Sequence, residues 1–172
     1  MPSNQECETD VNKPLSFNKD LSELVQVLKP LNGEKNFTSK LVSKVHFKAG
    51  QIIYPLKGLT LAKKRYTTVQ IGENNHIELN SDLVYMNHSC DPSVNVDTDN
   101  RFVIAMKDIA PGAELTFFYP TTEWDMDQPF QCWCSHPKCI KEVQGAKYLP
   151  KHVFEENKYI FNSHILKLKA SE

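Results

Sequence analysis

The stretch RFVIAMKDIAPGAELTFFY, residues 101–119, decides the class of fold. Its first part alternates across the two faces of an extended chain, with Phe102, Ile104 and Met106 against Val103 and Ala105. The Pro111-Gly112 pair that follows is a strong turn signal, and ELTFFY after it has the composition of a second strand. A strand, a tight turn and another strand in so short a stretch favour β-structure.

The residues before this stretch repeat the same pattern. LVSKVHF from Leu41 alternates, a turn is expected at 48–50, and QIIYPL then resumes an extended chain. YTTVQIG and HIEL are predicted as two more short strands. Short strands with little helix between them predict a mainly β fold of several small sheets, with a few short helices.

Helical patterns flank the predicted strands. Asp20 can cap a helix that runs as far as Pro30, because apolar residues recur there at helical spacing: Leu21, Leu24, Val25 and Leu28. Pro150 suits the first turn of another helix, which runs toward Ile160. Residues 1–14 are polar, contain two prolines and are expected to form a disordered tail.

Composition narrows the function classes. The 172 residues are 40% hydrophobic and 24% charged, which is ordinary for one globular domain. The net charge of -1 argues against direct nucleic-acid binding, which usually needs a basic excess. No apolar run approaches the roughly 20 residues of a membrane span, and the N-terminus lacks the pattern of a secretory signal. We therefore expect a cytoplasmic or nuclear protein that does not bind membranes, with reduced thiols.

Four of the five cysteines are spaced as ligands of one structural zinc ion. Three lie in FQCWCSHPKC: Cys132, Cys134 and Cys139. They leave one position of a tetrahedral site open, and Cys90 in NHSCDP is the natural fourth donor. Free thiols are the plainer alternative, and His136 is another zinc-ligating side chain nearby. The fifth cysteine, Cys7, belongs to the polar tail.

Three segments together resemble the SET family of protein lysine methyltransferases. YMNHSCDPS at 85–93 is similar to the family's Asn-His-Ser-Cys signature, and AMKDIAPGAELTFFY at 105–119 is similar to its Glu-Leu-Thr-Phe-Asp-Tyr segment. The cysteines at 132–139 resemble the post-SET zinc motif, which in this family shares its ion with the cysteine of the signature. The resemblance covers roughly residues 40–148 and implies a β-clip-like SET fold with a zinc-bound post-SET segment.

The resemblance also implies residue roles. Asn87 and His88 would bind S-adenosylmethionine, largely through backbone groups, together with Tyr85 and Trp133. Tyr119 would be the active-site tyrosine, holding a neutral lysine amine in line with the methyl group, so that alignment supplies most of the catalysis. The apolar walls of such a channel would come from the strand at its side: Leu115, Phe117 and Phe118.

The sequence also departs from the family pattern. Where the family has Gly-x-Gly near the cofactor, this chain has Thr38-Ser39-Lys40, and Phe118 replaces the aspartate before the active-site tyrosine. The predicted organisation is a tail at 1–14, a helical segment at 15–36, a SET domain at 37–120, a post-SET zinc segment at 121–148 and a helical extension at 149–172.

Three functions follow from these features. The first is S-adenosylmethionine-dependent methyl transfer to a lysine of a protein or peptide substrate. The second is a SET scaffold repurposed for small-molecule chemistry. The third is a zinc-stabilised interaction module without methyltransferase activity. Cofactor binding separates the third from the others, and methylation of a lysine peptide pool separates the first from the second.

Overall fold

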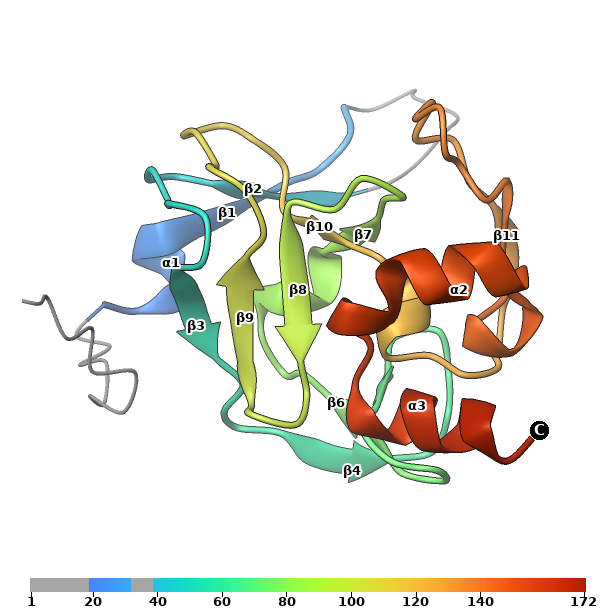
Figure 1. Ribbon diagram of the computed structural model, residues 1–172. Helices are drawn as coiled ribbons and strands as arrows, with labels where there is room; N and C mark the ends of the chain where they lie inside the picture. Colours follow the sequence, from blue (N-terminus) through green and yellow to red (C-terminus); the bar gives the residue numbers. More distant parts are fainter. Residues whose placement is uncertain (1–18, 32–38) are drawn as a thin grey trace, which may run out of the picture.

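The computed structural model describes residues 19–31 and 39–172, which Figure 1 traces from blue to red. The predicted tail at 1–14, with Cys7, and the position of Thr38 lie outside the described residues. Short strands in small sheets form the body of the molecule, and short helices flank them. The prediction of a mainly β fold with few short helices is confirmed.

Two three-stranded antiparallel sheets form the centre. One has the order β3-β9-β8 and consists of β3 (Ile52–Pro55), β9 (Phe102–Ala105) and β8 (Val94–Asp97). The other has the order β4-β6-β5 and consists of β4 (Thr60–Ala62), β6 (His76–Glu78) and β5 (Val69–Gln70). Strands β4 and β8 were not predicted from the sequence, whereas the extended segments around β3, β5, β6 and β9 were.

A short parallel ladder brings the site segments together. Strand β7 (Asn87–His88) pairs with β10 (Thr116–Phe117), so His88 lies opposite Phe117. Before β10 the chain turns where predicted: Gly112 has a φ of +84°, which favours glycine, and the Ala113 N–H donates to the Ala110 carbonyl at 3.0 Å. The turn therefore sends β10 back alongside β7. The 3₁₀ helix η1 (Asp82–Tyr85) leads into β7.

The predicted helix up to Pro30 is wrong beyond its first turn. Helix α1 (Leu21–Leu24) begins after Asp20, whose N–H donates to the Glu23 carboxylate at 2.9 Å. The chain then continues as β1 (Val25–Leu28), which pairs antiparallel with β2 (Lys40–Ser43). A segment this short gains little from helix propensity, and β2 pairs with all four of its residues along one edge.

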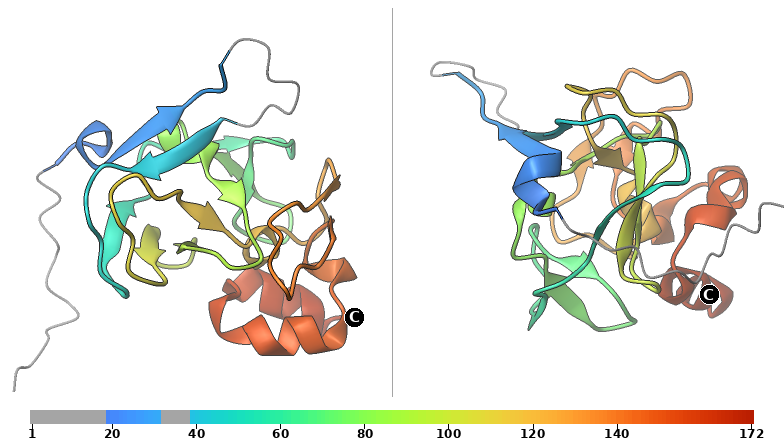
Figure 2. Two further views of the ribbon diagram at one scale, coloured as in Figure 1. Left: turned by 90° about the horizontal axis from the view of Figure 1, so that it is seen from above. Right: turned by 90° about the vertical axis from the view of Figure 1, so that its left-hand side faces the viewer.

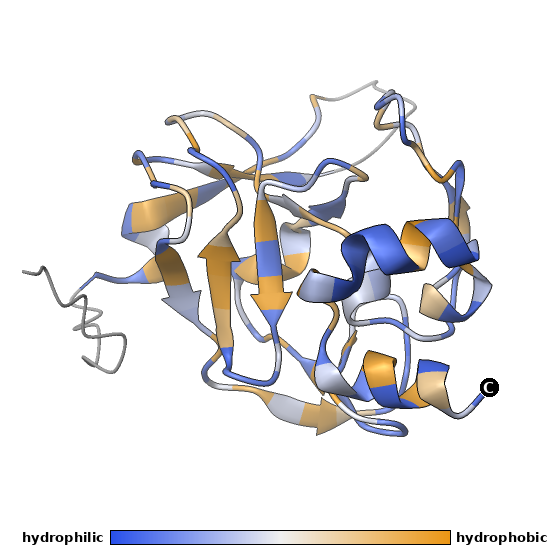
Figure 3. Ribbon diagram, in the orientation of Figure 1, coloured by the Kyte–Doolittle hydropathy of each residue, from blue (hydrophilic) through white to orange (hydrophobic). Residues whose placement is uncertain are grey.

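Two apolar clusters stabilise the molecule. The larger lies among the strands and includes Leu41, Val96, Val103 and Leu115, each with no exposed surface. The smaller lies beneath the C-terminal helices and is built on aromatic and aliphatic side chains, among them Phe118, Phe154, Phe161 and Ile165. Figure 3 shows apolar residues concentrated along β8 and β9, whereas α2 (Lys151–Asn157) is mostly hydrophilic.

The predicted C-terminal helical extension is present. Helix α2 follows Pro150 and continues as η4 (Lys158–Ile160), and α3 (Ser163–Ala170) packs beside it at one end of the molecule (Figure 2). The buried Asn162 fixes this extension to the sheets, since its side-chain amide donates to the Val96 and Thr121 carbonyls at 3.0 and 2.8 Å. In the described part of the chain, no helix is long and apolar enough to cross a membrane.

Candidate functional site

One cavity of about 840 Å³ brings together residues that are far apart in the sequence. Its wall includes β7, the turn after β10, the loop 64–69 and the stretch 126–134. Among the predicted site residues, Asn87, His88, Tyr119 and Trp133 line it. A cavity of this size, lined by apolar, polar and charged side chains, is suited to a small-molecule ligand.

Tyr119 lies in the wall of this cavity, at the start of the 3₁₀ helix η2 (Tyr119–Thr121) that follows β10. Its O–H donates to the Met86 carbonyl at 2.8 Å. The ring packs against Phe117 at 4.7 Å and Phe130 at 5.9 Å between centroids. Burial raises the pKa of Tyr119, so its hydroxyl stays protonated and can serve as a fixed polar group.

His88 links Tyr119 to the cysteines. The Tyr119 backbone N–H donates to His88 Nδ1 at 3.1 Å, so Nδ1 is an acceptor and the ring proton belongs on Nε2. Nε2 lies 3.3 Å from Cys90 Sγ, where it can donate to that sulfur. Burial lowers the pKa of His88 to about 4, which keeps the ring neutral. His88 is therefore a positioning residue between two parts of the site.

The Asn87 side chain is committed to the protein. Its Nδ2 donates to the Ser39 carbonyl and to Glu114 Oε1, both at 3.0 Å. It therefore holds the end of the chain segment where the Gly-x-Gly motif was expected. Lys40, which replaces the second glycine, is exposed and belongs to a regular strand pair opposite Leu28. The backbone at Lys40 thus needs no glycine conformation.

The remaining predicted residues take different positions. Tyr85 packs against the strand core and does not line the cavity, so its contact with a cofactor stays a prediction. Of the three expected apolar wall residues only Phe117 lines the cavity, because Leu115 and Phe118 are buried in the two clusters. Trp133 is 75% exposed at the cavity rim.

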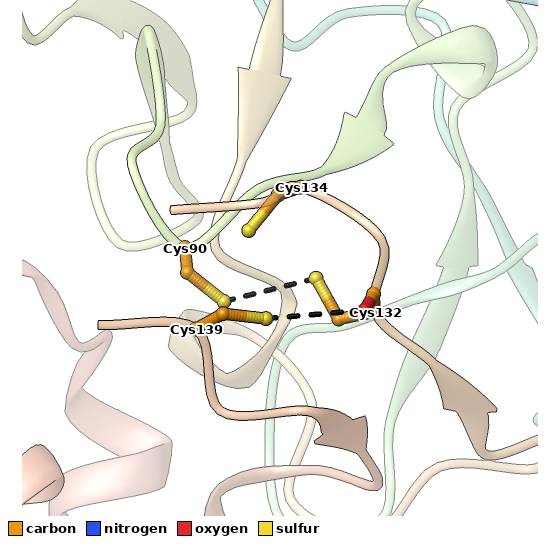
Figure 4. Close-up of side chains that lie close together, drawn as sticks. All are labelled: Cys90, Cys132, Cys134 and Cys139. Carbon is orange, nitrogen blue, oxygen red and sulfur yellow. Dashed lines mark hydrogen bonds between the residues drawn. The ribbon is translucent and has the colours of Figure 1, made fainter. Parts of the chain in front are cut away.

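The four predicted cysteines converge (Figure 4). The sulfur atoms of Cys90, Cys132, Cys134 and Cys139 all lie within 4.8 Å of one another. The Cys90–Cys132 separation is 3.8 Å, about the edge of a tetrahedron with metal–sulfur bonds of about 2.3 Å. The donor set and its spacing therefore fit one tetrahedral metal ion. His136 is not part of this group of four.

Backbone groups support the thiols. The Ile140 N–H donates to Cys90 Sγ at 3.5 Å and the Lys141 N–H to Cys139 Sγ at 3.4 Å. Such donors orient metal-bound sulfur and stabilise its negative charge. Burial raises the pKa of Cys132 to about 11, so the free thiol resists ionisation and a bound cation would supply the stabilisation.

Two residues of the site, Phe130 and Glu123, were not predicted from the sequence. Phe130 in β11 (Phe130–Gln131), paired antiparallel with β12 (Glu142–Val143), lies with its ring 6.0 Å from that of His88. Glu123, four residues after Tyr119, carries a carboxyl group in the cavity wall. An acidic residue four positions after the predicted active-site tyrosine was the available signal for Glu123, although it belongs to no motif.

Comparison with known proteins adds a family relationship. Residues 38–120 match the family model of the SET domain. The chain is 39% identical over 153 residues to a protein named methyltransferase flvH of Aspergillus flavus, and the match covers 87% of this chain and 83% of that protein. It is 28% identical over 135 residues to a histone-lysine N-methyltransferase of Candida albicans, H3 lysine-36 specific, covering 69% of this chain and 15% of that protein.

Solved structures show the same fold. Two structures of KRYPTONITE superpose with a TM-score of 0.50 at 19% identity, over 69% and 63% of this chain. One contains mCHH DNA, an H3(1-15) peptide and SAH, and the other contains mCHG DNA and SAH. The chain spans only 29% and 27% of the KRYPTONITE chains, so this likeness concerns the fold alone.

Proposed function

The chain belongs to the SET-domain family, and from that premise we propose that it transfers a methyl group from S-adenosylmethionine to the side-chain amine of a lysine in a protein substrate. The observation that carries the proposal is the position of Tyr119 in the wall of a cavity of about 840 Å³, two residues after the strand pair that brings in Asn87 and His88. The cavity is large enough for a nucleoside-sized cofactor and the end of an extended side chain.

Bound S-adenosylmethionine would supply an electrophilic methyl group on a sulfonium. Tyr119 would hold the incoming amine, because its hydroxyl is protonated, fixed at Met86 and surrounded by aromatic rings. Together with bound cofactor and substrate, Phe117 and Phe130 would shield that point from water, which would favour the neutral form of an amine. Alignment of the amine with the methyl group would be the main source of rate enhancement. Asn87, His88 and Trp133 are the proposed cofactor contacts.

We further propose that Cys90, Cys132, Cys134 and Cys139 bind one structural zinc ion. Four soft donors leave no open coordination position, so this zinc would stabilise the fold and take no part in the reaction. It would hold the stretch 130–142 against β7, and so would complete the rim on which Trp133 lies. Because His88 contacts both Cys90 and the Tyr119 backbone, a change in the zinc site would shift the position of Tyr119.

The test is methyl transfer from labelled S-adenosylmethionine to a lysine-containing peptide pool, comparing wild type with Tyr119→Phe. The substitution removes one oxygen and keeps the ring, so folding and cofactor affinity should be unchanged. Turnover should fall roughly 10–1000-fold, the scale of losing one well-placed polar group in an active site.

Two results would overturn the proposal. No binding of S-adenosylmethionine at millimolar concentration would leave the zinc-stabilised interaction module as the better reading. Cofactor binding with full turnover by the Tyr119→Phe protein would show that Tyr119 is not the active-site tyrosine.

A further inference from the structure

One acidic side chain in the cavity wall has no part in the chemistry described so far. Glu123 lies one turn after Tyr119, and its backbone N–H donates to the Tyr119 carbonyl at 3.0 Å. Both residues line the same cavity. Glu123 is partly buried and forms part of the cavity lining.

The two oxygens of this carboxyl group differ. Oε1 accepts the backbone N–H of Gln70 at 2.9 Å and the hydroxyl of Thr122 at 3.0 Å. Oε2 has no hydrogen bond or ion pair with any described residue. The carboxyl group is therefore held rigidly by one oxygen and offers the other to a ligand. A carboxylate oxygen without a protein partner can accept a charge-assisted hydrogen bond from a cationic ligand.

In the described structure, no neighbouring cationic side chain forms an ion pair with Glu123. Lys64, in the loop at the cavity wall, is near enough to lower the pKa of Glu123 but forms no ion pair with it in the described structure. Arg65 beside it is paired with Glu78 at 2.6 Å. Tyr119 is neutral. A positively charged group entering the cavity would thus find the unpaired Oε2 of Glu123 near Tyr119, whose pKa the charge of Glu123 helps to raise after the larger effect of burial.

We propose that Glu123 binds the ammonium form of the substrate amine through Oε2 and accepts its proton before methyl transfer. This inference rests on the proposed function and deepens it, because it assigns the residue that recognises a cationic primary amine and converts it to the nucleophile.

The step balances as a proton transfer followed by a displacement. An N–H bond of the ammonium breaks, its electron pair stays on nitrogen, and the proton forms an O–H bond at Oε2. The neutral amine then uses that pair to form the N–C bond, while the bond from the methyl carbon to the sulfonium breaks and its pair goes to sulfur. The product is a methylammonium and a thioether, and Glu123 releases its proton to solvent through the cavity.

The acidity of Glu123 suits a proton acceptor. Burial raises the pKa of Glu123 to about 7, against the opposing effect of the bonds from Gln70 and Thr122 and of the charge on Lys64. An acceptor with a pKa near neutrality can take a proton and give it up again within one cycle. The other titratable groups that line the cavity are the following: Lys64, Arg65, Tyr66, His88, Glu114, Tyr119, Asp127, Cys132 and Cys134.

Glu123→Gln is the matched variant. The glutamine oxygen can still accept from Gln70 and Thr122, so the local structure is retained, while the free oxygen is replaced by an amide that neither binds a cation nor takes a proton. Asp127→Asn is the control, because it makes the same change of charge at an exposed position of the same cavity wall.

The first measurement needs no turnover. Binding of butan-1-amine and butan-1-ol is followed by NMR titration at pH 8 in the full chain with its metal. Wild type and Asp127→Asn should bind the amine at least about 10-fold more tightly than the alcohol, as expected for a charge-assisted contact. Glu123→Gln should bind both within about twofold. Equal preference for the amine in Glu123→Gln would overturn the proposal.

The second measurement uses the methylation assay. Turnover by Glu123→Gln should fall roughly 100-fold at pH 8, within the range of general base catalysis. Wild-type turnover should decline as the pH falls through about 7, and that decline should be absent from the residual activity of Glu123→Gln. A wild-type rate in Glu123→Gln would overturn the role of Glu123 while leaving methyl transfer intact. Failure of S-adenosylmethionine to bind would instead refute the proposed function itself.

Discussion

The strand core and the cysteine segment 127–142 are held in place by different forces. The core residues Val94, Val96, Val103 and Leu115 are at most 1% exposed and belong to one continuous apolar cluster. No residue of 127–142 is buried, although this segment covers one side of the cavity. Its described long-range contacts are few: backbone bonds, the four converging thiols and the ring contacts of Phe130 with His88 and Tyr119. The exposed Lys138–Glu156 ion pair and the half-buried Ile140 add to these. Apolar burial thus folds one region, whereas metal ligation can fold the other.

Removal of the metal should have the largest effect, and it should affect the cysteine segment much more than the strand core. Cys132→Ser, or treatment of the wild type with a strong chelator, should leave segment 127–142 without order, because binding and folding are coupled at such sites. Hydrogen exchange should then show complete loss of protection there and near-native protection in β8 and β9. Simultaneous unfolding of both regions would show that the core depends on the ion as well.

A control for this experiment is His136→Ala. His136 is close to the cysteines in sequence but outside the group of four sulfur atoms. We expect its substitution to leave about one zinc per chain in elemental analysis. A loss of half the zinc would mean that the imidazole is a ligand after all.

A truncation in the core should have the opposite pattern. Leu115→Ala removes a side chain with no exposed surface and should lower the free energy of unfolding by about 2–5 kcal/mol. Chemical denaturation measures this change. The folded fraction should still bind one metal ion per chain, since Leu115 does not contact the cysteines. Selective loss of the metal would contradict the separation of the two regions.

A smaller effect on stability is expected at Asn87, whose side chain links β7 to Ser39 and Glu114. Asn87→Ala deletes the bonds to Ser39 and Glu114 and should cost about 1–2 kcal/mol of stability. The freed segment at Ser39 should also weaken S-adenosylmethionine binding, which isothermal titration measures. Unchanged affinity would show that this segment does not contribute to the cofactor site.

The last effect concerns how the stability contributed by Glu123 depends on pH. The pKa of about 7 in the folded protein exceeds the ordinary value of 4.5, so the folded state keeps a proton that the unfolded chain releases between these pH values. The contribution of Glu123 to stability therefore decreases as the pH rises from about 4.5 to 7. Glu123→Gln should flatten the stability profile in this window, by no more than about 1.4 kcal/mol per pKa unit. Identical profiles would contradict the raised pKa.

Much of the fold followed from local pattern. The alternation around β9, the turn at Pro111-Gly112 and the helix after Pro150 were all present in the sequence and in the structure. The meeting of Cys90 with the distant cluster was also predictable, because a tetrahedral site needs a fourth soft ligand. These features are determined by residues that are close in sequence or by a recognisable motif.

The remaining features depend on tertiary contacts that leave no local signal. Residues Val25–Leu28 fit a helix and became a strand because β2 provides partners for their backbone. The position of Glu123 in the cavity requires Gln70, 53 residues away, to hold its carboxyl group. Phe130 reaches His88 only because the cysteine segment returns across the cavity. None of these contacts is encoded by spacing.

A single glycine limits how this architecture can diverge. Gly145 has a φ of +113°, and a Cβ there would collide with the Trp124 carbonyl. The chain crosses itself at this point, with the Ala146 N–H donating to the Glu123 carbonyl at 2.8 Å and the Lys147 N–H to the Trp124 carbonyl at 3.0 Å. Any single substitution of Gly145 should therefore be selected against during evolution for as long as the two segments stay in contact. Descendants of this sequence should therefore keep or lose the glycine and the crossing beside Glu123 together.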